Sequence, residues 1–473
     1  MAEKVTEADS SKNKDLTKES DSDRNKNLSD IDVEKIKERK RTESIVLRVS
    51  ASNNFRTGVG MNYVVPFALA MGANNIQVGL LSSLPALLGN SVQLLTPKFM
   101  ETHSRKKLAM IGAFAESFMW LVMICLGILF FTFKQVYTVD LLIFIYSILF
   151  IFAIYYTPAW SSLLKDIVSD HRGNFFANRD RIRAFSRLLA LLIAALILDY
   201  FRRYDLLLGF AVLFLLAGVS CFISGIFYKQ VHEPKLELTK GYYFTFWQFI
   251  KNIPKSNFGK FSIFITLVHF SMYLALPFFT VYMLKTLSFS YTQWMIIIIS
   301  GVVSSMIFLP FWGHFVDTYG NLRAVKITSF LLPIVPLLWL ASSIVAKKSP
   351  HLLLAYLIIL EAFSGMVLSG FNLAFANFVY DAVTPQRMAL CMAYNNTLNN
   401  IGIFIGATVG GVIAASDAQI FMMPPLMLVF LISAISGFIL FGIMMPALKE
   451  VRDVHKFGIE EAKEELLAFT HLK

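Results

Sequence analysis

The chain has 473 residues, of which 56% are apolar and only 16% are charged, and its mean hydropathy is +0.59. A soluble globular domain carries roughly 25% charged residues, so this composition excludes an ordinary water-soluble protein and indicates an integral protein of the lipid bilayer. The net charge of +11 requires no nucleic acid as a partner, because basic residues also accumulate where a membrane protein meets anionic lipid.

Residues 1–50 differ from the rest of the chain, because they are rich in Ser, Asn, Asp, Lys and Glu and contain no apolar run. We expect a disordered cytoplasmic tail there. Beyond it, uncharged stretches of about 20 residues follow one another, and each is predicted to be a transmembrane helix, since backbone groups in hydrocarbon must be satisfied within their own segment. The twelve predicted spans are 53–72, 76–97, 107–133, 138–164, 182–200, 206–228, 261–284, 292–314, 323–346, 351–380, 387–415 and 418–446.

The distribution of Lys and Arg predicts the orientation of these spans. The connections after the even-numbered spans hold most of the basic loop residues, and the opposite connections hold few. Because cytoplasmic loops are enriched in Lys and Arg, we predict a multi-pass protein of the cell membrane with both termini in the cytoplasm. We expect no Lys or Arg deep within a span.

The longest internal connection, residues 229–260, separates two groups of six spans at 51–228 and 261–448. Within it, residues 242–251 mix aromatic side chains with Lys, a composition typical of a helix that lies in the membrane interface. The stretch 449–473 has the pattern of a charged, amphipathic cytoplasmic helix. The sequence therefore predicts two helical bundles, a cytoplasmic linker and two cytoplasmic tails.

Two short motifs occur once in each half of the chain. Asp166 and Arg172, which follow the fourth span, return at the same offset as Asp381 and Arg387, which follow the tenth. The second motif follows the second and the eighth spans, at residues 97–107 and 313–323. The shared separation indicates two related halves that run in the same direction, which is a parallel repeat.

The second motif resembles the signature loop of the major facilitator superfamily. Gly313, Asp317 and Gly320 keep the two glycines and the aspartate of that signature, whereas the first copy keeps an acid, Glu101, and a basic pair that begins at Arg105. The resemblance covers roughly residues 51–448. It implies an all-α fold of twelve transmembrane helices in two pseudo-symmetric six-helix bundles, and it implies secondary transport.

The same resemblance implies a cytoplasmic gate. Asp317 would face the amino end of the span at 182–200, and Glu101 would face that of the eleventh span near Arg387, where unpaired N–H groups favour negative charge. Gly320 would permit the tight turn between the helices. The alternative is that these acids only balance their basic neighbours. Asp166, Arg172 and Asp381 belong to the same predicted gate region.

Polar residues in the helices that would line a central cavity are the candidate substrate or coupling residues, because polar groups are costly in lipid. By the resemblance, these helices are the first and fourth of each half. The candidates there are Asn62, Tyr63, Tyr155, Tyr156, His269, Tyr273, Glu361 and Asn372, and the eleventh span adds Asn399.

Glu361 is the deepest of these candidates, because ten mostly apolar positions, or about 15 Å of helix, separate it from His351. A carboxyl near the middle of the bilayer favours its neutral form and suits uptake and release of a proton, although a hydrogen bond to a neighbouring helix would explain it equally well. His269 titrates near neutral pH when it is not simply a satisfied core residue. Asn399 fits either substrate or an interhelical hydrogen bond.

The sequence contains no nucleotide-binding P-loop, no metal-ligand cluster and no nucleophile elbow. We therefore expect no cofactor, no enzymatic activity and no pumping driven by ATP. The favoured function is secondary active transport of a small molecule by alternating access, with H⁺ as a possible coupling ion. The alternative is a membrane receptor or scaffold that does not transport. A membrane-embedded enzyme would need titratable residues that converge at one depth, and only scattered ones occur.

Overall fold

The computed structural model describes residues 40–133, 137–167, 172–233, 246–253, 256–383, 385–416 and 423–451, and every regular element among them is helical. Ten of the described helices are long and apolar enough to cross a membrane. This confirms the all-α, multi-pass prediction. The other two predicted spans, 53–72 and 76–97, are also helical over most of their length, but they are less apolar than these ten.

The described part of the first half begins with a helix over residues 40–59, followed by a short 3₁₀ turn and eight further helices before the linker. Its elements are η1 (Met61–Tyr63), α2 (Val64–Ala70), α3 (Asn75–Gln93), α4 (Thr96–Thr102), α5 (Arg105–Phe133), α6 (Thr138–Ile154), α7 (Thr157–Ile167), α8 (Arg172–Phe201) and α9 (Leu206–Gln230).

The second half has the same order of long helices. Its elements are α10 (Phe246–Asn252), which falls in the predicted interfacial stretch, α11 (Asn257–Val281), the π-helical η3 (Tyr282–Thr286), α12 (Tyr291–Tyr319), α13 (Asn321–Leu331), α14 (Ile334–Lys348), η4 (Pro350–Leu352), α15 (Leu353–Ala382), α16 (Pro385–Ala415), α17 (Pro425–Met444) and η5 (Met445–Ala447). The predicted helix at 449–473 lies outside the described residues beyond Val451.

Several predicted spans are interrupted where proline or close packing prevents a continuous helix. The fourth span divides into α6 and α7 just before Pro158, and the ninth divides into α13 and α14 at Pro333, because proline lacks the N–H that the helix needs. The first span is interrupted at Gly60, where an added Cβ would come within 2.6 Å of the Trp120 ring.

The predicted tail, residues 1–50, extends too far at its end, because residues 40–50 are helical. The chain is already helical at residue 40, and Ile45 and Val49 are buried in a cluster that includes Leu108 and Tyr228. The helix over these residues was not predicted, because only one of its faces is apolar and the overall composition is polar. Residues 1–39 lie outside the described part of the chain.

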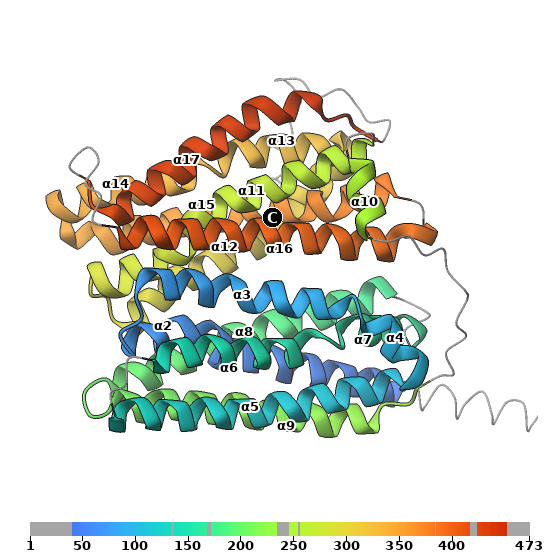
Figure 1. Cartoon of the computed structure of the whole chain (residues 1–473), viewed down its shortest axis with the longest axis horizontal. Coiled ribbons are helices and arrows are strands. Elements are labelled where there is room, and N and C mark those ends of the chain that lie inside the picture. Colours follow the sequence, from blue (N-terminus) through green and yellow to red (C-terminus); the bar gives the residue numbers. More distant parts are fainter. Residues whose placement is uncertain are drawn as a thin grey trace, which may run out of the picture.

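The long helices run roughly parallel to one another in two layers, with the first half below and the second half above in Figure 1. α3 and α16 lie side by side along the junction, where an added Cβ at Gly79 would come within 2.4 Å of the Ala407 carbonyl oxygen. The two predicted bundle boundaries fit this arrangement and remain predictions. The junction between the layers is where a site shared by both halves must lie.

Candidate functional site

A cavity of about 280 Å³ lies between the two halves of the molecule. It is lined by η1, α2, α3 and α6 on one side and by α11 and α12 on the other. Its walls are largely apolar, with amide, hydroxyl and indole groups among them, which is the composition of a small-molecule site. The lining residues are Met61, Asn62, Val64, Val65, Leu81, Ser82, Pro85, Ala86, Tyr146, Phe150, Thr280, Trp294 and Ile298.

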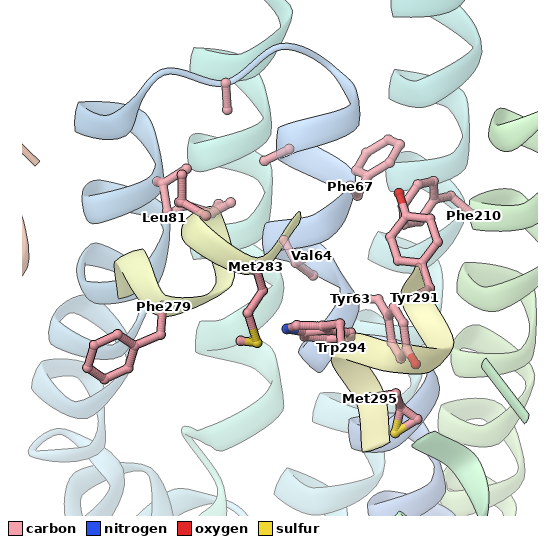
Figure 2. Packing of buried hydrophobic residues seen from close by; sticks show 14 of the residues in the cluster. Tyr63, Val64, Phe67, Leu81, Phe210, Phe279, Met283, Tyr291, Trp294 and Met295 are labelled. Atoms are coloured by element: carbon pink, nitrogen blue, oxygen red, sulfur yellow. The ribbon is translucent and has the colours of Figure 1, made fainter. Parts of the chain in front are cut away.

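Aromatic residues from both halves pack together at one end of this cavity. We call it the closed end, and it is the end at which α2 joins α3, α8 joins α9 and η3 joins α12. The Tyr63 ring meets the Trp294 ring edge-on at 5.3 Å, and Phe210 meets Tyr291 at 6.1 Å. Figure 2 shows these four side chains, with the start of α12 inserted beside α2. Aromatic contacts therefore join the first half to the second here.

Three sets of hydrogen bonds also cross between the halves at the closed end. The Asp199 carboxylate, near the end of α8, accepts from the backbone N–H groups of Tyr291 (2.9 Å) and Thr292 (2.8 Å) at the start of α12. These N–H groups have no partner within their own helix, and the helix dipole favours a negative charge beside them. The other two bonds run from Lys285 Nζ to Ala73 O (2.6 Å) and from Asn75 Nδ2 to Ala414 O (2.6 Å).

Asn62 lines the cavity and is held in a fixed orientation. Its Nδ2 donates to the Thr57 carbonyl oxygen at 2.8 Å, and its Oδ1 faces Arg187 Nη2 of α8 at 3.4 Å. The Arg187 Nε is buried and has no hydrogen-bond partner among the described residues. One helical turn away, the Tyr63 hydroxyl donates to the Leu191 carbonyl oxygen at 2.9 Å. Arg187 is not itself a lining residue, but its guanidinium contacts Asn62, which is.

Arg187 was not expected at this depth. It lies within the predicted span 182–200, but it was grouped with the basic connection that precedes this span. The helix that is long and apolar enough to cross the membrane, Asn178–Phe201, fully encloses it. The prediction that no Lys or Arg lies deep within a span is therefore wrong. Its distance from the end of the span would have revealed Arg187 in the sequence.

A second deep cation, Arg56, is paired within the first half. Its Nη1 donates to Oε2 of Glu116 on α5, and both side chains are nearly inaccessible. The other carboxylate oxygen, Glu116 Oε1, faces Trp120 Nε1 at 3.4 Å. This ion pair neutralises both charges inside one bundle, so it differs from Arg187, which has no acid beside it among the described ion pairs.

The remaining candidates of the first half do not line the cavity. The Tyr155 hydroxyl donates to the Leu108 carbonyl oxygen at 2.7 Å. The Tyr228 hydroxyl donates to Tyr156 Oη at 3.3 Å and accepts from Asn53 Nδ2 at 2.9 Å. Both candidate tyrosines therefore contribute to a polar network inside the first bundle.

In the second half, Glu361 lies where α12 and α15 approach most closely. Its side chain lies against Gly301, since a Cβ added there would come within 3.0 Å of Glu361 Cγ. An added Cβ at Gly365, one turn along α15, would come within 2.0 Å of the Gly301 carbonyl oxygen. No hydrogen bond or ion pair to another described residue involves the Glu361 carboxyl.

The other candidates of the second half are distributed over several contacts. His269 Nδ1 lies 2.9 Å from the Ile265 carbonyl oxygen, and its ring lies 5.8 Å from that of Phe371. Asn399 is buried and accepts from the Thr266 hydroxyl at 3.1 Å, which links α16 to α11. Tyr273 is half-buried and Asn372 is exposed. The structure thus brings Asn62 to the cavity wall, buries Tyr63 at its closed end and places these residues elsewhere in the second bundle.

The described gate residues make contacts within their own halves. The Arg105 side chain is buried beside Glu233 (Nε to Oε1, 3.3 Å), and Glu233 also accepts from the Arg105 backbone N–H at 2.8 Å. In the second half, Glu450 accepts from the Leu322 backbone N–H at 2.7 Å, and Asp381 accepts from Asn321. An acid that follows the sixth helix of each half therefore caps the start of the third.

Asp317 is exposed near the end of α12, Gly313 has open space around it, and Gly320 adopts a φ of 93° at the turn into α13, as a glycine in that position allows. The remaining gate residues lie on described helices, but their side chains lie outside the described part of the chain. They are Glu101 on α4, Asp166 on α7, Arg172 on α8 and Arg387 on α16.

The comparisons with known proteins agree with this architecture. The model of the Major Facilitator Superfamily matches residues 261–472. No curated protein matches the chain in sequence.

Solved transporters share the fold at low sequence identity. The nucleoside transporter NupG superposes with a TM-score of 0.64 at 15% identity and covers 86% of this chain and 98% of its own. A bacterial homologue of the iron transporter ferroportin, in an inward-facing state, gives 0.60 at 14% identity over 85% and 98% of the two chains. An inward-facing bacterial homologue of the human lysosomal transporter Spinster gives 0.58 at 12% over 88% and 99%. The family model thus matches the second half of the chain, and both halves share the fold of these solved transporters.

Proposed function

We propose that this protein is a secondary transporter that moves a small molecule across the cell membrane by alternating access. The observation that carries the proposal is the cavity between the halves, which both halves line and which hydrogen bonds between the halves close at one end. A receptor or scaffold on the same fold would not need a cavity between its halves beside a set of hydrogen bonds that join them.

The orientation follows from the distribution of basic residues. The closed end contains the connections that hold few Lys and Arg, so by the positive-inside rule it faces away from the cytoplasm. Both termini are then cytoplasmic, and the conformation is inward-facing. In the outward-facing conformation, Asp317 and Glu101 would engage the opposite bundle and latch the cytoplasmic side, as the family signature implies.

Proton coupling is the second part of the proposal. Glu361 has a carboxyl at mid-depth with no partner among the described residues, and it lies on the contact between α12 and α15. Addition of a proton there removes a charge that hydrocarbon disfavours, so protonation favours closer packing of this helix pair. His269, Tyr273, Asn372 and Asn399 remain candidates for contact with substrate or for structural support.

Accessibility of introduced cysteines from each side of the membrane tests the transport proposal. In a variant without Cys125, Cys221 and Cys391, Ser82→Cys in the cavity wall should react with a membrane-impermeant thiol reagent applied from the cytoplasmic side. A screen of small molecules for thermal stabilisation would then identify a substrate, and saturating substrate should expose the same cysteine to the outer side. A cysteine that reacts from neither side would contradict transport through this cavity.

A further inference from the structure

Arg187 has an arrangement that the packing of the helices alone does not explain. Arg187 lies twelve residues, or about 18 Å of helix, before Asp199, which we place at the outer surface, and therefore near the middle of the membrane. A cation at that depth is costly unless it is paired. Arg56, at a similar position in the first bundle, has Glu116 as its partner. Arg187 has only a weak contact with Asn62, at 3.4 Å.

The geometry of this contact leaves N–H donors of the Arg187 guanidinium free to bind another group. Asn62 uses its amide N–H on the Thr57 carbonyl oxygen and offers Oδ1 to a single nitrogen, Arg187 Nη2. The Nε of Arg187 is buried without a partner. A guanidinium has five N–H donors in a planar fork, which matches the two oxygens of a carboxylate or a phosphate.

A counter-charge for Arg187 would have to come from the cavity, because the neighbouring side chains do not supply one. Arg187 lies one helical turn from Leu191, whose carbonyl holds Tyr63 against Trp294 at the closed end, and Asn62 and Trp294 both line the cavity. One turn earlier on α8, Arg183 pairs with Asp180 at 3.1 Å. No acidic side chain among the described residues forms an ion pair with Arg187.

We propose that Arg187, positioned by Asn62, binds the anionic carboxylate or phosphate group of the transported molecule. The substrate class is therefore a small organic anion. The inference rests on the proposed transport function, because it places the substrate in the same cavity. When the substrate binds in the cavity, its anionic group would neutralise the charge of Arg187, for which the folded chain supplies no counter-charge.

The reaction rates of a cysteine beside the site test this charge preference without a known substrate. Met61→Cys, in the cysteine-free variant, places a thiol on the cavity wall next to Asn62. We expect a negatively charged methanethiosulfonate to react faster, relative to a positively charged one, when Arg187 is present. Arg187→Gln should lower this ratio on the order of ten-fold, since a unit charge nearby is weakly screened in such a site. Arg183→Gln, one turn away, is the matched control and should leave the ratio within about two-fold.

Protection experiments identify the source of the anion. Inorganic phosphate or succinate at millimolar concentration should slow the reaction of Met61→Cys in vesicles of pure phosphatidylcholine, and Arg187→Gln should remove the protection. Protection that appears only when phosphatidylglycerol is added to the vesicles would show that Arg187 binds a lipid headgroup, and it would overturn the proposal. An unchanged ratio in Arg187→Gln would also overturn it.

These outcomes remain distinct from failure of the transport proposal. If Met61→Cys and Ser82→Cys react with neither reagent from either side, the cavity is closed and transport itself is contradicted. If both cysteines react but show no charge preference, transport stands and the anion site is wrong.

Discussion

The pair of Arg56 and Glu116 shows how strongly a single buried charge depends on its partner. Glu116→Gln should destabilise the protein by about 3–5 kcal/mol, because Arg56 would remain buried and charged without compensation. The double variant Arg56→Met, Glu116→Leu should recover most of this loss. Thermal unfolding of the purified protein would measure both. Asp180→Asn, which breaks a partly exposed pair with Arg183, should cost no more than about 1 kcal/mol.

Glu361 offers a residue-scale test of proton coupling. Once a substrate is identified, Glu361→Gln should abolish the dependence of the transport rate on the proton gradient while leaving exchange of substrate between the two sides intact, because glutamine mimics the protonated acid at the α12–α15 contact. Transport in reconstituted vesicles at imposed pH gradients provides the measurement. A gradient dependence equal to that of the wild type would remove Glu361 from this role.

Individual residues were predicted from the sequence with uneven success. Asn62 could be placed at a cavity because an amide in an apolar span is rare, and it does line one. Arg187 was grouped with the basic loop before it, although the predicted span 182–200 already included it. Tyr155 and Tyr156 turn inward within their bundle because the kink before Pro158 changes which face of the helix meets α5 and α9. Side-chain direction at a kink does not follow from spacing.

Among the helices, α12 and α15 approach each other closely through Gly301 and Gly365, where an added Cβ would meet backbone at only 2.0 Å. Gly365→Ala should destabilise the protein by roughly 1–3 kcal/mol, because the new methyl group would overlap the Gly301 carbonyl oxygen and force the helices apart. Gly442→Ala on α17 is the matched control, since an added Cβ there meets no atom within 4 Å. Thermal unfolding of the two variants would compare them directly, and equal stabilities would contradict the close approach.

The long helices could be predicted from the sequence, whereas their interruptions could not. Apolar length alone indicates a crossing, and ten of the predicted spans meet that criterion as observed helices. The helical structure of residues 40–50 and the break at Gly60 depend instead on contacts with distant residues, Leu108 in one case and Trp120 in the other. Local sequence does not contain these contacts.

For the molecule as a whole, Asp199 is the residue on which closure depends most directly. Asp199→Ala removes both hydrogen bonds to the start of α12 and should cost the closed end about 1 kcal/mol, which is roughly a five-fold change in the populations of two conformations. Ser82→Cys should then react faster from the outer side. Asp205→Ala removes a cap from α9 within the first half, at the same end, and should leave this rate unchanged. Equal effects of the two variants would contradict a cross-bundle role for Asp199.

The duplication of the chain is visible in the sequence and has a counterpart in the contacts. The paired motifs predict equivalent connections, and Glu233 and Glu450 indeed cap equivalent helices in the two halves. The closed end could not be predicted, because the repeat describes each half separately and the contacts between halves depend on the conformation.

The close approach of Gly301 and Gly365 means that α12 and α15 must shift together as one stiff unit. The amino end of α12, which Asp199 holds, lies about 15 Å along the helix from Gly301 and hence from the Glu361 side chain. If protonation of Glu361 takes part in the cycle, as proposed above, a rearrangement around that carboxyl would be carried along α12 to the distant hydrogen bonds of Asp199.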